Sequence, residues 1–128
     1  MRVHCDAEGE KVGIVQHADG LAEVGGRNAY LTPELCFRLH EPRDDSRTAR
    51  AIAVLAHEAQ HLRGIRDEGV ANCNAFRSGI PLGVRLGLSR AAAERMMRQQ
   101  LAENAIQARA APEYLVPPGC SLDRSVQG

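Results

Sequence analysis

Long apolar runs are missing from this chain of 128 residues, and their absence excludes a class of protein. No stretch approaches the roughly 20 apolar residues that a transmembrane helix needs, so we expect no membrane partner. The first residues, MRVHCDAEGEK, lack the apolar centre of a signal peptide. As given, the sequence therefore predicts a soluble protein, cytoplasmic as it stands and secreted if it is the mature fragment of an exported protein.

Basic residues form no run, although they are numerous. The chain has 16 Lys and Arg against 16 Asp and Glu, which gives a formal net charge of zero. Residues 1–45 carry nine acids and five bases, and residues 46–128 carry seven acids and eleven bases. Because the bases are scattered instead of forming a stripe that could follow a phosphate backbone, we expect no nucleic-acid partner.

The cysteines also lack a familiar spacing. Cys5, Cys36, Cys73 and Cys120 form no CxxC pair, so a zinc site made of cysteines is disfavoured. Two disulfides and four free thiols both remain open. For an exported chain the even count suits two bridges, and among the three possible connectivities we favour Cys36 with Cys73 and Cys5 with Cys120.

The length suits one domain over residues 1–128, and the patterns predict an α+β fold. Short apolar runs separated by Asp-Gly and Gly-Gly predict a small antiparallel sheet within residues 11–31. The later segments predict about four helices, with Thr32 and Ser89 as N-caps of the first and last. Their expected ranges are 33–42, 47–63, 67–77 and 89–109, and the last has an apolar stripe of Met97, Leu101, Ala105 and Ala108.

The second of these helices carries His57-Glu58-Ala59-Gln60-His61, an HExxH sequence. Two histidines four residues apart lie on one face of a helix, so both rings can reach one ion. Glu58, about 100° round from His57, could reach a water on that ion and act as a general base. Because this pattern is typical of zinc hydrolases, we predict Zn²⁺ as the cofactor, with His57 and His61 as metal ligands.

A catalytic zinc needs a third protein ligand, and two neighbouring acids could supply it. Gly64 permits a sharp turn that would bring Asp67 beneath the metal. Alternatively, Asp67 caps a new helix, Glu68 is the ligand, and Asn72 one turn later bonds to a ligand histidine. We favour Glu68, because this second account explains both acids.

The motif HExxH resembles that of gluzincin metallopeptidases, and Glu68-x-x-Ala71-Asn72 resembles the ExxAN of the ImmA/IrrE family, with Pro81 near its trailing proline. This resemblance implies a zincin-like fold with zinc on His57, His61 and Glu68 and with Glu58 catalytic. The longer motif HExxHxxGxxD also resembles snapalysin-like secreted peptidases, in which Asp67 would be the ligand.

The sequence therefore predicts a zinc metallopeptidase that hydrolyses peptide bonds in a peptide or protein substrate. The expected cleft lies between an edge strand and the central helix, where an extended substrate could pair with the strand. Tyr114 could donate its hydroxyl to the reacting carbonyl oxygen, although a tyrosine beside Leu115 and Val116 is more often a core anchor. The alternatives are a zinc-binding module without activity and a zinc amidohydrolase that does not cleave peptides, such as one acting on cell-wall amides.

Overall fold

The computed structural model describes residues 1–7 and 20–122, which form a small sheet and four α-helices. The sheet contains β1 (Arg2–Cys5), β2 (Gly20–Ala22) and β3 (Asn28–Leu31). The helices are α1 (Pro33–His40), α2 (Ser46–Leu62), α3 (Glu68–Arg85) and α4 (Arg90–Gln107), followed by a 3₁₀ turn, η2 (Pro112–Tyr114). The α+β class is thus confirmed, and no helix in the described ranges is long and apolar enough to cross a membrane.

The sheet is mixed, so the antiparallel pairing predicted within residues 11–31 is confirmed for β2 and β3 but does not describe the whole sheet. Its strand order is β1-β3-β2; β2 pairs antiparallel with β3, whereas β1 pairs parallel with β3. The sequence analysis did not predict β1, because all four of its residues are exposed and therefore show no apolar alternation. The predicted sheet also included residues 11–19, which lie outside the described part of the chain.

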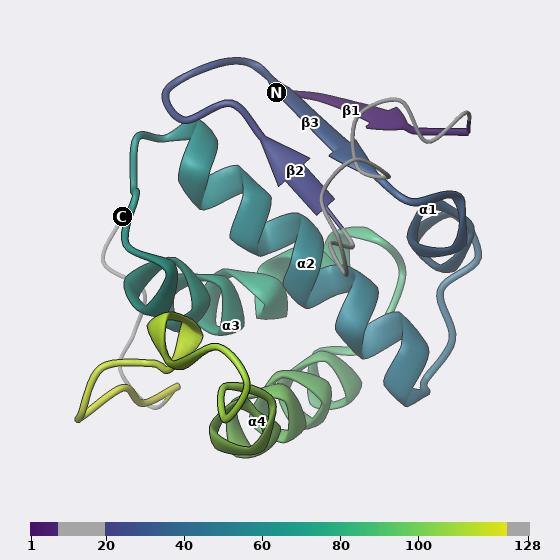
Figure 1. Cartoon of the computed structure of the whole chain (residues 1–128). Helices are drawn as coiled ribbons and strands as arrows, with labels where there is room; N and C mark the ends of the chain where they lie inside the picture. The colour runs from purple at the N-terminus through teal and green to yellow at the C-terminus, as the bar shows by residue number, and fades with distance from the viewer. Residues whose placement is uncertain (8–19, 123–128) are drawn as a thin grey trace.

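Helix α2 passes between the sheet and the pair α3 and α4 (Figure 1). On one side its residues pack with Leu31 of β3 and Leu35 of α1, and on the other with α3 and α4. Thr48, Ile52 and Leu55 of α2 are buried in these contacts, and His57 and His61 are buried on another face of the helix. A helix covered on several sides holds the candidate ligands more rigidly than a surface helix would.

Asp45 caps the N-terminus of α2, and its loss should cost stability. Its Oδ1 accepts a hydrogen bond from the backbone N–H of Thr48 at 2.8 Å, and this bond is the main reason why the carboxyl pKa lies below its ordinary value of 3.8. We expect Asp45→Ala to lower the free energy of unfolding by about 1 kcal/mol at pH 7. Urea titrations of the variant and the parent chain measure the difference.

The pH dependence of this effect follows from the lowered pKa. An acid with a lower pKa in the folded state stabilises the fold above its unfolded pKa, and the contribution disappears as the pH falls through the folded value. The gap between Asp45→Ala and the parent should therefore shrink in acid. Asp45→Asn, which keeps a cap without a charge, should retain most of the stability at pH 7; equal losses in both variants would contradict the capping account.

Helix α3 runs to Arg85, well beyond the predicted end at residue 77. Gly79 and Pro81 have low helix propensity, but Pro81 is exposed and Gly79 lies against α4. A Cβ at Gly79 would come within 2.3 Å of Sδ of Met97. The close packing of the two helices therefore outweighs the weak helix propensity of this segment.

The buried stripe of α4 differs from the predicted one. Met97 and Ala108 are buried as expected, but Ala105 is exposed and Leu101 is only half-buried. The polar residues Gln100 and Asn104 are buried instead, with 5% and 3% of their surfaces exposed. This face of α4 thus presents two carboxamides towards the interior, where polar groups need hydrogen-bond partners.

The predicted disulfide pairing is wrong, because the bonds join Cys5 to Cys36 and Cys73 to Cys120. Cys5 lies opposite Leu31 in the parallel pair β1 and β3, and α1 begins two residues later, which brings Cys36 close. The prediction failed because it contained no β1. The second bond ties α3 to the segment after α4, residues 112–122, which we call the C-terminal strap.

Candidate metal centre

The turn between α2 and α3 brings the candidate ligands together. Helix α2 ends at Leu62, and Gly64 adopts a φ of 96°, a left-handed conformation that glycine accepts without steric cost. The chain then reverses, and α3 begins at Glu68 with Asp67 as its N-cap. Glu68 therefore stands on the first turn of α3, facing the last turns of α2.

Three side chains converge at this turn. The Oε1 atom of Glu68 lies 2.9 Å from Nε2 of His57 and 2.7 Å from Nε2 of His61. Among the described residues, these three form the group that could hold a metal ion, with donor atoms within 4.8 Å of one another. Two histidines and a glutamate are a donor set found in catalytic zinc sites.

The other ring nitrogens of both histidines face hydrogen-bond acceptors. Nδ1 of His61 lies 2.7 Å from the carbonyl oxygen of Ile65, which can only accept. Nδ1 of His57 lies 2.7 Å from Oδ1 of Asn72, whose NH₂ group donates elsewhere, to the carbonyl of Tyr114. The hydrogen-bond network thus places a proton on Nδ1 of each ring.

With Nδ1 protonated, a neutral imidazole has a lone pair on Nε2. Burial, the largest cause, lowers the pKa of His57 and so favours its neutral form. Nε2 of each histidine and Oε1 of Glu68 face one another at hydrogen-bond distance. Histidine nitrogens and a carboxylate oxygen are donors that zinc binds, so this donor set fits a divalent metal.

Asp67 takes no part in this group. Its Oδ1 accepts a hydrogen bond from the backbone N–H of Val70 at 2.9 Å, the ordinary contact of an N-cap. The predicted cap at Asp67 is therefore confirmed, and so is the predicted hydrogen bond between Asn72 and a histidine of the HExxH motif. Of the two acids considered from sequence, the structure brings Glu68 to the histidines.

Asn72 holds His57 in orientation, so its loss should weaken metal binding. Outer partners of a ligand histidine fix its tautomer, and their removal typically lowers metal affinity by about 10–100-fold. We expect a loss of this size in Asn72→Ala, measured by competition with a zinc chelator dye. Asn74→Ala is the matched control, because Asn74 donates to the side chain of Gln60 instead of to a candidate ligand; equal losses in both variants would contradict the role of Asn72.

Glu58 lies beside the group and is buried, with 6% of its surface exposed. Burial, the main cause, raises its pKa to about 7. Gly20, the first residue of β2, covers it so closely that a Cβ there would lie 3.0 Å from Oε2 of Glu58. Among the described residues, the carboxylate makes no hydrogen bond to another side chain, and it lines the same pocket as the histidines, which leaves it available to a water or a substrate.

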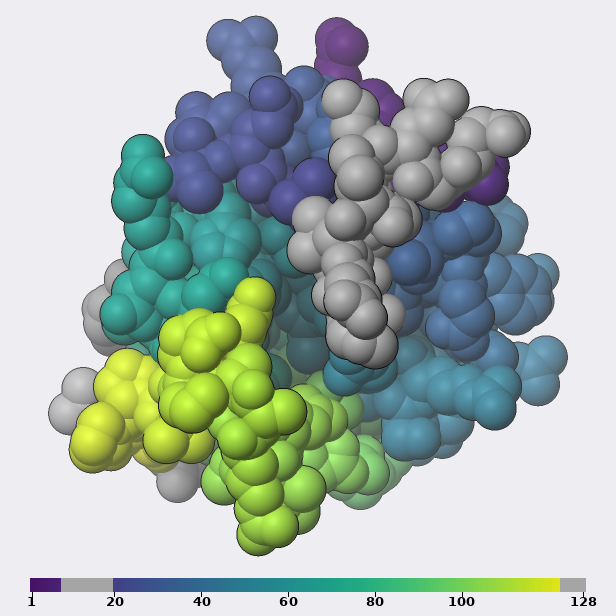
Figure 2. All heavy atoms as spheres, in the orientation of Figure 1, coloured from purple at the N-terminus to yellow at the C-terminus, as the bar shows by residue number. Residues whose placement is uncertain are grey.

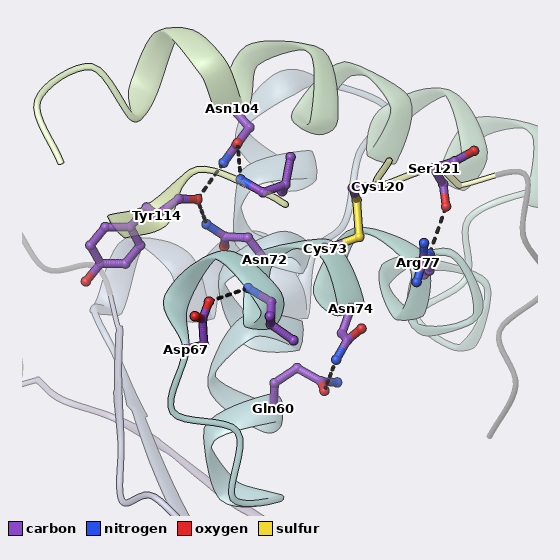
Figure 3. The surroundings of a disulfide bond; sticks show 12 residues. Gln60, Asp67, Asn72, Cys73, Asn74, Arg77, Asn104, Tyr114, Cys120 and Ser121 are labelled. Carbon is purple, nitrogen blue, oxygen red and sulfur yellow. Dashed lines mark hydrogen bonds between the residues drawn. A yellow bond between two sulfur atoms is a disulfide. The ribbon is translucent and has the colours of Figure 1, made fainter. Parts of the chain in front are cut away.

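The C-terminal strap brings Tyr114 to this centre. Its ring centroid lies 6.1 Å from that of His57, and burial together with a hydrogen bond to Glu68 raises its pKa to about 12. Asn72 and Asn104 both donate to the carbonyl of Tyr114, at 2.8 and 3.1 Å (Figure 3). Tyr114 is 38% exposed, so it is a residue of the site and the interpretation as a core anchor is wrong.

Further contacts fix the strap. Asn104 also accepts from the backbone N–H of Val116 at 3.0 Å, so its carboxamide clamps the strap through both of its ends. Cys120 is bonded to Cys73 of α3, close to where Arg77 donates to the carbonyl of Ser121 (Figure 3). The sequence analysis missed Asn104, because one asparagine among the polar residues of a helix gives no signal until its partners are known.

A pocket of about 880 Å³ surrounds the centre. It is lined by β2 on one side, by α2 and the start of α3 at its base, and by α4 and the strap on the other side. In Figure 2 the hollow opens between the blue-violet residues that follow position 20 and the yellow-green C-terminal residues. The cleft expected between the sheet edge and the central helix is therefore present.

Comparison with protein families, with curated proteins and with solved structures finds no match to this chain.

Proposed function

We propose that this protein is a zinc-dependent metallopeptidase of the zincin type, with His57, His61 and Glu68 as metal ligands and Glu58 as general base. The observation that carries the proposal is the convergence of Nε2 of His57, Nε2 of His61 and Oε1 of Glu68, with Nδ1 of each histidine facing another hydrogen-bond acceptor. The resemblance of HExxH and ExxAN to gluzincin motifs supports the same donor set.

Zinc, when bound, supplies a Lewis acid that acidifies water and polarises a carbonyl group. Glu58 accepts the proton of the attacking water and passes it to the leaving amine. Its position on α2 suits this role, because it follows His57 directly and faces the same pocket. Tyr114, at the opposite wall, can donate a hydrogen bond to the substrate carbonyl as negative charge develops on its oxygen.

The edge of β2 favours a peptide as the substrate. Among the described residues, β2 pairs with β3 on one side only, and its three residues, Gly20 to Ala22, line the pocket. An extended peptide could therefore add to this edge through backbone hydrogen bonds and lie across the metal centre. Gly20 allows this approach, because a side chain there would fill the space above Glu58.

Metal removal tests the proposal. The purified chain should bind one zinc ion per molecule, hydrolyse peptides from a mixed library, lose that activity in a chelator and regain it when zinc is restored. Elemental analysis measures the bound zinc, and mass spectrometry of the products measures the cleavage of the peptides. His57→Ala should show neither the bound zinc nor the cleavage.

Two outcomes would replace this proposal with an alternative. Bound zinc without cleavage of any peptide in the library would indicate a binding module. Cleavage of muropeptides with casein and library peptides left intact would indicate an amidohydrolase that acts on cell-wall amides. Activity that survives complete removal of metal would contradict all three interpretations.

A further inference from the structure

Gln100 is a buried polar side chain that the metal centre does not use. It lies on α4, has 5% of its surface exposed, and lines the pocket. The hydrogen bonds within the described residues include none for its carboxamide, although they account for Asn104 and Asn72 nearby. No fully enclosed side-chain nitrogen or oxygen in that part of the chain lacks a partner, so the carboxamide of Gln100 must be reached from the pocket.

The packing of α4 against α2 places Gln100 in the wall of the pocket that holds the metal centre. Met97, about one turn before Gln100 on α4, packs in one cluster with Ile52 and Ala53 of α2. Asn104, one turn later, binds the carbonyl of Tyr114, whose ring faces His57. Gln100 therefore faces the stretch of pocket between Ala53 and the metal centre.

The pocket lining also includes apolar residues of the helices that pack against α4, beside the charged Arg50. Ala53 and Val54 of α2 and Phe76 of α3 line the pocket here together with Gln100. Ala53 and Phe76 are 7% and 5% exposed, so they form a fixed wall. Such a subsite accepts the aliphatic part of a side chain and offers a hydrogen-bonding group at one position.

We propose that Gln100 is a specificity-determining residue that selects a substrate side chain ending in a primary carboxamide, glutamine or asparagine, next to the scissile bond. This inference rests on the proposed peptidase function. A carboxamide both donates and accepts, so a second carboxamide can satisfy its N–H and its carbonyl oxygen together. A carboxylate satisfies only the N–H groups, and an apolar side chain satisfies neither.

Paired peptides that differ only in glutamine or methionine at one position test this selection. The two side chains are similar in size, so the ratio of their kcat/KM values reports the carboxamide contact. We expect the wild-type protein to prefer glutamine by about 10–100-fold at one position beside the scissile bond. Gln100→Met should bring that ratio close to one, because its thioether cannot pair with the amide.

The matched control is Gln99→Met, the same substitution one residue away on α4. Gln99 is exposed and donates to Glu103, so the preference for glutamine should remain unchanged. Both peptides compete in one reaction, so partial unfolding of a variant cancels in the ratio, and unchanged zinc binding by Gln100→Met verifies its fold. A wild-type ratio near one, or a preference for glutamate over glutamine, would overturn the proposal.

A binding measurement separates this inference from the peptidase function. In the ¹⁵N-labelled protein, the side-chain amide signals that disappear in Gln100→Met belong to Gln100. They should shift on titration with N-acetylglutamine N-methylamide and stay in place with the methionine analogue. Shifts without hydrolysis would support the subsite while contradicting the peptidase, whereas signals that move with neither compound would refute the subsite even if peptides are cleaved.

Discussion

Glu58→Gln is expected to bind zinc as tightly as the wild-type chain and to hydrolyse peptides about 10²–10⁴-fold more slowly, the usual contribution of a general base. Gln keeps the size of Glu58 but cannot accept a proton at the pH of the reaction. Zinc affinity should be retained because Glu58 lies outside the group of three donor atoms. Metal analysis and kcat/KM on one peptide, with both proteins in the same buffer, measure the two effects.

Gln60→Glu is the control, because it adds a carboxylate to the same helix from which Glu58→Gln removes one. Gln60 is buried two residues further along but binds Asn74 of α3 and does not line the pocket. In the double variant with Glu58→Gln, the carboxylate introduced at position 60 should lower stability. It should not restore the hydrolysis that Glu58→Gln has lost. Full activity in Glu58→Gln, with zinc bound, would refute the role of Glu58 and leave the metal site intact.

Glu68→Ala should abolish tight metal binding, whereas Asp67→Ala should leave it in place. Glu68 supplies an oxygen 2.7 Å and 2.9 Å from the two histidine nitrogens, and Asp67 binds only a backbone N–H. Loss of a direct ligand should cost more than the roughly 10–100-fold that loss of an outer partner costs. Asp67→Ala should instead lower the free energy of unfolding by about 1 kcal/mol, the usual value of an N-cap.

Glu68→Ala and Asp67→Ala each truncate one of two neighbouring acids, so each variant is the control for the other. Chelator competition measures the zinc affinity of each, and urea titration of the metal-free proteins measures stability. A larger affinity loss in Asp67→Ala than in Glu68→Ala would favour the HExxHxxGxxD interpretation, with Asp67 as ligand. Equal affinity in both variants and the parent would mean that the metal binds elsewhere.

The sequence predicted best the features that depend on local spacing. Positions 57 and 61 meet because they lie one turn apart on a single helix, and Asp67 and Asn72 could be assigned from their distances to Glu68 along the next helix. A cap and an i,i+4 pair involve neighbours in the chain, so no tertiary information is required. These relations account for nearly all of the candidate centre.

Features that depend on contacts distant in sequence were missed. β1 pairs with β3, which follows β2 in the chain, and β1 itself has no apolar pattern. The two disulfides could not be assigned without this pairing. The sequence analysis made no prediction for Gln100 and Asn104, because a polar residue on a helix is usually exposed and gives no signal of burial. Their burial depends on the strap and on α2, which contact α4 only in the folded chain.

The connectivity of the four cysteines has a consequence for biosynthesis. The first bond closes residues 5–36 and the second closes residues 73–120, so the two loops neither overlap nor enclose one another. A nascent chain that emerges from its N-terminus presents both members of the first pair before Cys73 exists. Oxidation in the order of synthesis therefore leads directly to the native pairs, and an isomerase is needed only for chains whose first bond forms late.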